Sequence, residues 1–266
     1  MLLRRAHPRN SGTCSISQML ASNSAGPRHD MRVDGTVTSP NHDARPRSVR
    51  PSLLILHYTG MQSAAAAIDR LCDPLTTVSA HYVIDERGEV TQLVAEERRA
   101  WHAGFGGWRN ITDVNSHSIG IELVNPGHEW GYRPFPEEQI RTLVELASAI
   151  RDDHRLSPAA VIGHSDTAPA RKTDPGELFP WASLAEHGLG IWPASAPRRA
   201  VDLPTALSQL AIIGYRLDLP GTVPAQVIAA FQRHWRPELV DGVLDAETMG
   251  VIEAVARLSG EGQAPT

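Results

Sequence analysis

Residues 52–57 read Ser-Leu-Leu-Ile-Leu-His, so four consecutive apolar residues stand between two polar ones. A short and wholly apolar run is typical of a central strand that is buried on both faces. Residues 118–124 (Ser-Ile-Gly-Ile-Glu-Leu-Val) and 160–163 (Ala-Val-Ile-Gly) predict two further strands. These three runs indicate the middle of a sheet.

The segments between these strands predict helices and a hairpin. Residues 81–85 and 90–94 alternate around a turn that contains Gly88, which favours a β-hairpin. Apolar residues recur at helical spacing over 61–71 and 136–154. The order of elements predicts an α/β fold, in which a mixed, twisted sheet is flanked by helices.

A second unit is expected near the C-terminus. Residues 188–204 are rich in proline and glycine without periodicity, as in an interdomain linker. Three helical patterns follow, and they predict a small three-helix domain over residues 205–258. Because few contacts usually cross such a linker, we expect the domain at 40–187 to fold without these helices.

The N-terminal residues give no clear cellular address. Residues 1–39 lack the apolar stretch of a secretory signal, and we expect a disordered or mis-called extension, with Met31 as an alternative start. The absence of a signal peptide favours the cytoplasm.

Composition excludes several classes of protein. The 266-residue chain has a net charge of −5, the wrong sign for binding nucleic acid through its phosphates. It has no apolar run of the roughly 20 residues that span a bilayer. Two cysteines are too few for a disulfide scaffold. We therefore expect a soluble, monomeric protein that binds no nucleic acid and has no transmembrane segment.

Polar side chains stand at the ends of the predicted strands. His57 and His164 each follow a strand directly, and Glu122 lies near the end of the third. A loop shaped by proline and glycine follows His164 and can return Asp174 to it. Two imidazoles and a carboxylate are a common ligand set for catalytic zinc. The spacing alone leaves open that these histidines are structural.

Two nucleophiles fit less well than a metal site. Ser165 follows a histidine but lacks the Gly-x-Ser-x-Gly elbow of a serine hydrolase. Cys72 lies in an apolar, helix-like segment, where a packed thiol is more common than a reactive one.

Five motifs, in order along the chain, resemble one enzyme family. They are His57-Tyr-Thr, Ser79-Ala-His-Tyr-Val-Ile84, Trp101-His-Ala-Gly104, Asn115-Ser-His-Ser-Ile-Gly-Ile-Glu122 and His164-Ser-Asp-Thr-Ala-Pro-Ala-Arg-Lys-Thr-Asp174-Pro-Gly176. Residues 40–185 thus resemble the zinc-dependent N-acetylmuramoyl-L-alanine amidases of the amidase-2 type, a group related to phage amidase-type lysozymes and peptidoglycan recognition proteins.

The C-terminal helices resemble a peptidoglycan-binding domain. The motifs that carry this second resemblance are Gly214-Tyr215, Ala230-Phe-Gln-Arg-His234, Arg236-Pro237, Asp241-Gly242 and Asp245-x-x-Thr248.

The first resemblance implies a role for each matched residue. Zinc would be held by His57, His164 and Asp174. Glu122 would transfer a proton between the attacking water and the leaving nitrogen, and Lys172 would support the developing oxyanion. Tyr82 matches a position where some phage members place a catalytic tyrosine, and a pocket wall is the alternative. The other expected substrate contacts are His81, Trp101, His102, Asn115 and Arg171.

The implied reaction is hydrolysis of the amide between N-acetylmuramic acid and L-alanine, in peptidoglycan or its muropeptides. One alternative is a non-catalytic recognition module, since some members of the superfamily only bind. Another is a cytosolic recycling enzyme restricted to anhydromuropeptides. The added helical unit instead resembles envelope amidases, which favours the periplasm or the outer-membrane face and leaves the compartment open.

Overall fold

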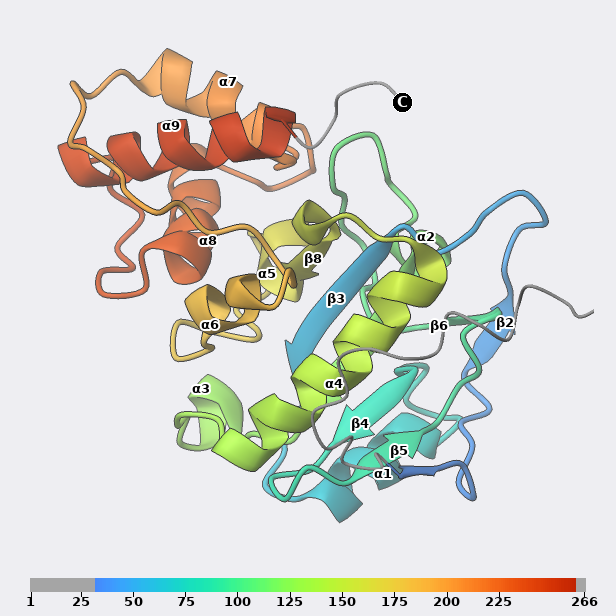
Figure 1. Cartoon of the computed structure of the whole chain (residues 1–266). Helices are drawn as coiled ribbons and strands as arrows, with labels where there is room; N and C mark the ends of the chain where they lie inside the picture. Colours follow the sequence, from blue (N-terminus) through green and yellow to red (C-terminus); the bar gives the residue numbers. More distant parts are fainter. Residues whose placement is uncertain (1–31, 262–266) are drawn as a thin grey trace, which may run out of the picture. The chain divides into compact units, whose positions relative to one another are not determined.

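A computed structural model describes residues 32–261, which contain one mixed six-stranded sheet in the order β1-β5-β4-β7-β3-β8 (Figure 1). Its strands are β1 (Val33–Asp34), β3 (Leu53–Tyr58), β4 (Tyr82–Ile84), β5 (Val90–Gln92), β7 (Ser118–Leu123) and β8 (Val161–Gly163). The three apolar runs form adjacent parallel strands, with β3 between β7 and β8. The predicted hairpin is the antiparallel pair β4–β5. The α/β prediction is therefore confirmed.

Helices cover both faces of this sheet. Helix α4 (Glu137–His154) crosses one face, as Figure 1 shows, and its apolar stripe shares a buried cluster with Ile84 and Leu123. Helix α1 (Ala64–Cys72) covers the other face, where Leu71 packs with Val83. Ser63 caps α1 by accepting a hydrogen bond from the Ala66 N–H. Most apolar residues of the central strands are consequently buried.

Several short elements were not expected from the sequence. They are the two-stranded sheet of β2 (His42–Ala44) and β6 (Arg98–Ala100), and the short helices α2 (Val114–His117), α3 (Gly127–Trp130), η2 (Pro158–Ala160), α5 (His164–Thr167) and α6 (Trp181–Glu186). Each is four residues or fewer, apart from α6, so none shows a hydrophobic period.

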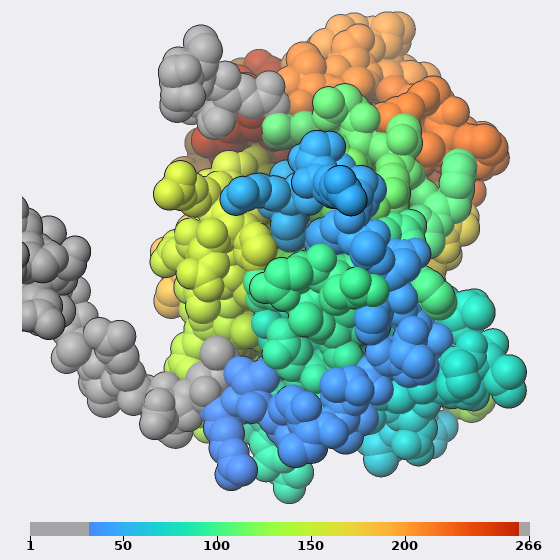
Figure 2. Space-filling model, turned by 90° about the vertical axis from the view of Figure 1, so that its right-hand side faces the viewer, coloured from blue at the N-terminus to red at the C-terminus, as the bar shows by residue number. Residues whose placement is uncertain are grey.

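Part of the expected N-terminal extension over residues 1–39 belongs to the folded part of the chain. Val33 and Asp34 pair in parallel with Val90 and Thr91 of β5, and the buried Ser39 donates to the Leu71 carbonyl. The blue segment that follows β1 runs over one face of the molecule beside the green segment that contains β6 (Figure 2). Residues 1–31 of that prediction lie outside the described residues.

The three C-terminal helices are present as predicted. They are α7 (Leu203–Ile213), α8 (Pro224–Trp235) and α9 (Ala246–Glu261). Asp245 precedes α9 and accepts a hydrogen bond from the Thr248 N–H, which is the geometry of an N-cap. Within residues 32–261, no helix is both long enough and apolar enough to cross a bilayer.

These helices do not stand apart from the sheet, contrary to the expectation of few contacts across residues 188–204. One buried cluster runs from β3 through Leu189 to α7, α8 and α9. The indole N–H of Trp235 donates to the Ile191 carbonyl, 2.9 Å away. The described residues 32–261 also group as one compact unit by their contacts. The boundaries at 188 and 204 stay a prediction, but the packing across them is that of a shared core.

We predict that ending the chain after Pro193 destabilises the remaining fragment. Removal of α7–α9 exposes the buried Trp108 and takes away two hydrogen-bond partners of Asp166, and each large apolar side chain that becomes exposed costs about 1.5–3 kcal/mol. The check is thermal unfolding by circular dichroism, with ending the chain after Glu261 as the control. A soluble fragment 1–193 with the melting temperature of the full chain would contradict this prediction.

Candidate metal and catalytic site

The register of the sheet places the first two site residues side by side. His57 on β3 pairs with Glu122 on β7, and partners in a parallel register point to the same face. His164 is the first residue of α5, directly after β8, whose Gly163 pairs with Leu56. Three strand ends therefore meet at one edge of the sheet, as the sequence predicted.

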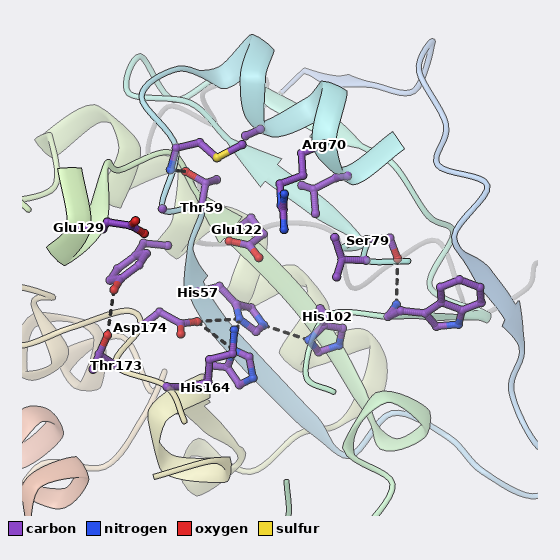
Figure 3. A pocket seen from close by; sticks show the side chains of 18 of the residues that line it. His57, Thr59, Arg70, Ser79, His102, Glu122, Glu129, His164, Thr173 and Asp174 are labelled. Atoms are coloured by element: carbon purple, nitrogen blue, oxygen red, sulfur yellow. Dashed lines mark hydrogen bonds and ion pairs between the residues drawn. The ribbon is translucent and has the colours of Figure 1, made fainter. Parts of the chain in front are cut away.

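Three side chains converge there with their ligand atoms almost touching (Figure 3). His57 Nδ1 and His164 Nδ1 are 3.0 Å apart, and each lies within 3.0 Å of Asp174 Oδ2. All three residues are buried. Asp174 is returned to His164 by a backbone hydrogen bond from the Ser165 N–H to the Asp174 carbonyl, at 2.9 Å. The three potential metal-ligand atoms thus form a compact triangle, although their residues are far apart in the sequence.

The outer nitrogens of both imidazoles are engaged, which leaves the inner nitrogens bare. His164 Nε2 lies 2.9 Å from the Ala103 carbonyl and must donate its proton there. His57 Nε2 lies 3.0 Å from His102 Nδ1, and His102 Nε2 lies 3.1 Å from Ser118 Oγ. Because the Ser118 hydroxyl donates to the Val114 carbonyl, protons order along this chain and His57 Nδ1 keeps its lone pair. Such outer hydrogen bonds orient metal-ligating histidines.

The charge states also suit metal binding. Burial, together with the neighbouring His164, lowers the pKa of His57 to about 4, so this imidazole is neutral near pH 7. Burial alone would raise the pKa of Asp174, but the two histidines hold it below its usual range. Neutral imidazole and ionised carboxylate are the forms that bind metals. These three residues could therefore hold a metal ion.

Glu122 and Lys172 line the same cavity, whose volume is about 530 Å³. Glu122 Oε2 is buried and finds no hydrogen-bond partner within residues 32–261. Burial, reinforced by the charge of Asp174, raises the pKa of Glu122 well above its usual value. A carboxyl group with a raised pKa and an unpaired oxygen is suited to exchanging protons with a bound molecule.

Four of the six expected substrate contacts lie at this cavity or its continuation. Trp101, His102 and Arg171 line both parts, and Asn115 lines the continuation. His102 and Asn115 are buried and also have structural partners. The Asn115 side-chain oxygen accepts hydrogen bonds from the backbone N–H groups of His102 and Ala103.

The other two expected contacts, Tyr82 and His81, are placed elsewhere. Tyr82 pairs with Ile121, one residue before Glu122, so the alternation of the strand directs it to the opposite face of the sheet. Its hydroxyl donates to Glu96, 2.7 Å away. His81 is fully buried and accepts a hydrogen bond from the Gly120 N–H. Neither residue lines the cavity or its continuation, so this geometry does not favour them as substrate contacts, and their contact with substrate stays a prediction.

Three groups that shape the site were not found from the sequence. They are the Ala103 carbonyl, the Ser118 hydroxyl and the Asp166 carboxylate. The motifs quoted above include all three residues, but a motif does not say which member faces the metal and which supports a ligand.

Comparison with known proteins agrees with this geometry. Residues 47–177 match the Amidase_2 family model, described as N-acetylmuramoyl-L-alanine amidase. The N-acetylmuramoyl-L-alanine amidase AmiD of Escherichia coli is 35% identical, over 91% of this chain and 96% of its own length. The 1,6-anhydro-N-acetylmuramyl-L-alanine amidase AmpD of the same species is 32% identical over 55% of this chain and 87% of its own.

Solved structures extend the similarity to the whole fold. A complex of Escherichia coli AmiD with anhydro-N-acetylmuramic acid-L-Ala-D-γ-Glu-L-Lys has a TM-score of 0.71 and 37% identity, covering 82% of this chain and 93% of its own. AmpDh3 of Pseudomonas aeruginosa has a TM-score of 0.72 and 33% identity, covering 89% of this chain and 99% of its own.

We predict that His164→Ala abolishes metal retention. Loss of one of three convergent ligands leaves a pair that holds a divalent ion poorly. The check is metal content by elemental analysis after gel filtration, with the exposed His187→Ala as the control. One metal ion per chain in His164→Ala would remove this residue from the ligand set.

Proposed function

The chain belongs to the N-acetylmuramoyl-L-alanine amidase family, and from this premise we propose that it is a zinc hydrolase acting on peptidoglycan fragments. The bond cleaved is the amide between the lactyl group of N-acetylmuramic acid and L-alanine. One observation supports this proposal above the others: a triangle of three bare ligand atoms lies in the same cavity as a carboxyl oxygen that has no partner among the described residues.

Zinc fits the donor set of this triangle. Two imidazole nitrogens and one carboxylate oxygen match its preference for nitrogen and oxygen ligands, and three protein ligands are typical of catalytic zinc sites. His57, His164 and Asp174 would hold the ion. The chemistry that zinc supplies when bound is Lewis acidity, which brings the pKa of a water molecule close to 7.

The residues around this position divide the proton transfer and the charge stabilisation between them. Glu122 takes a proton from the attacking water while the water oxygen bonds to the carbonyl carbon of the amide. Glu122 then returns the proton to the alanine nitrogen as the C–N bond breaks. Lys172, on the wall of the same cavity, stabilises the negative charge that develops on the carbonyl oxygen. The products are the free lactyl carboxylate and the free stem peptide.

The substrate class follows from the related complexes. Both AmiD and AmpDh3 were crystallised with anhydromuramoyl peptides. We propose that this chain also accepts soluble muropeptides with 1,6-anhydro ends. A module that only recognises peptidoglycan would not need the unpaired Glu122 oxygen, so hydrolysis is favoured over recognition alone.

The substrate proposal is tested with purified protein on two substrates. We expect hydrolysis of soluble anhydromuropeptides. Mass analysis should show a free stem peptide and a free anhydromuramic acid product, whose masses add up to the mass of the substrate plus one water. Intact sacculi assayed in parallel show whether polymeric peptidoglycan is also cleaved. Removal of zinc by a chelator should abolish activity, and added zinc should restore it. Unchanged muropeptides with the zinc-loaded protein would refute the proposed function.

We predict that Glu122→Gln keeps zinc but loses most turnover. The amide preserves the size of the side chain but cannot accept the proton, and loss of a general acid–base residue costs about 10²–10⁴-fold in rate. The measurements are kcat on a muropeptide and zinc content, with the exposed Glu238→Gln as the control. A rate within a few fold of wild type, at equal zinc content, would exclude Glu122 from proton transfer.

A further inference from the structure

Asp166 is a fully buried carboxylate to which the proposed reaction assigns no role. It lies on α5, two residues after the ligand His164. A carboxylate without solvent contact needs several hydrogen-bond donors, since burying an unpaired charge is costly. The identity of those donors therefore indicates what Asp166 connects.

The donors to Asp166 come from two distant parts of the chain. The Gly163 N–H, directly before His164, donates to Oδ2 at 2.8 Å. The Tyr215 hydroxyl donates to Oδ1 at 2.5 Å, and His234 Nδ1 lies 2.7 Å from Oδ2. Asp166 thus links the backbone next to the metal ligand with α8 and with the turn that follows α7.

His234 is itself held in one orientation. Its ring stacks between Trp181 and Trp235, with ring centroids 3.8 and 3.5 Å away. Tyr215 is likewise buried and packs edge-on against Trp108, at 5.1 Å between ring centroids. Both donors therefore approach Asp166 from fixed positions.

The turn after α7 also holds the loop on the other side of His164. The Arg109 N–H donates to the Gly214 carbonyl at 2.7 Å, and the Gly107 N–H donates to the Thr167 carbonyl of α5 at 2.8 Å. In Figure 2 the orange C-terminal segment lies directly against the green part of the chain that contains this loop. The same loop begins next to Ala103, whose carbonyl accepts the outer proton of His164.

We propose that Tyr215 and His234 are positioning residues for His164, so that the C-terminal helices form part of the scaffold of the metal site. Through Asp166 they fix the start of α5, and through Gly214 they fix the loop that carries the Ala103 carbonyl. His164 is thereby held from both its backbone and its outer ring nitrogen. This inference rests on the proposed role of His164 as a zinc ligand.

The test uses the full-length protein and separates hydrogen bonding from packing. Tyr215→Phe removes only the hydroxyl, and His234→Phe keeps a flat ring between the two tryptophans but removes the N–H donor. For the double variant we expect zinc Kd to rise about tenfold, the lower end of the range for groups that orient metal ligands. The absorption bands of the cobalt-substituted protein should shift, and kcat on a muropeptide should fall with little change in KM. When His234→Asn replaces His234→Phe in this double variant, the asparagine keeps an N–H near the position of Nδ1. Part of the lost zinc affinity should then be recovered.

A control variant separates this role from general stability. Ile252→Ala leaves a cavity in the buried face of α9 and should lower the melting temperature without changing zinc Kd or the cobalt spectrum. If the double variant changes only the melting temperature, as Ile252→Ala does, Tyr215 and His234 merely hold the helices and the inference is overturned. Wild-type protein that binds no zinc would overturn the proposed function together with this inference, so the two failures are distinguishable.

Discussion

The candidate metal site depends on holding three lone-pair atoms, two imidazole nitrogens and one carboxylate oxygen, close together in a buried place with no proton between them. His57 Nδ1, His164 Nδ1 and Asp174 Oδ2 lie within 3.0 Å of one another, and the outer nitrogens of both imidazoles are engaged by the Ala103 carbonyl and by His102. Such an arrangement is repulsive unless a cation neutralises it. The surrounding fold therefore has to supply rigidity that the three side chains cannot supply themselves.

The sheet supplies part of this rigidity through register and close packing. His57 and Glu122 are neighbours because β3 and β7 pair in parallel over their full lengths. The His102 ring lies directly over Gly120 of β7, where an added Cβ would come within 2.5 Å of it. Because this residue has no side chain, the His102 ring can approach Ser118, whose hydroxyl is held by the Val114 backbone carbonyl. The orientation of His57 is thereby fixed through His102. The absence of a side chain at Gly120 is thus a requirement of the candidate metal site.

The sequence predicted the central strands and the convergence of His57, His164, Asp174 and Glu122, because buried strands are apolar and polar residues at their ends are conspicuous. It did not predict the placement of Tyr82, although strand alternation relative to Glu122 contains that information once the register is known. Register depends on pairing between distant segments, and a single sequence does not state it. The same limit applies to His81, whose partner is a backbone N–H 39 residues away.

The C-terminal helices show how a motif can report a fold rather than a contact. Their resemblance to a peptidoglycan-binding domain depends on residues such as Tyr215, Phe231 and His234, and all three are buried here. Tyr215 and His234 face Asp166, and Phe231 stacks on Trp235 at 5.0 Å. The core residues of a helical unit can match a sequence motif whatever the surface of that unit binds. A glycan would have to be recognised by other, exposed side chains of these helices, whereas Tyr215 and His234 connect the helices to Asp166, beside the candidate metal site.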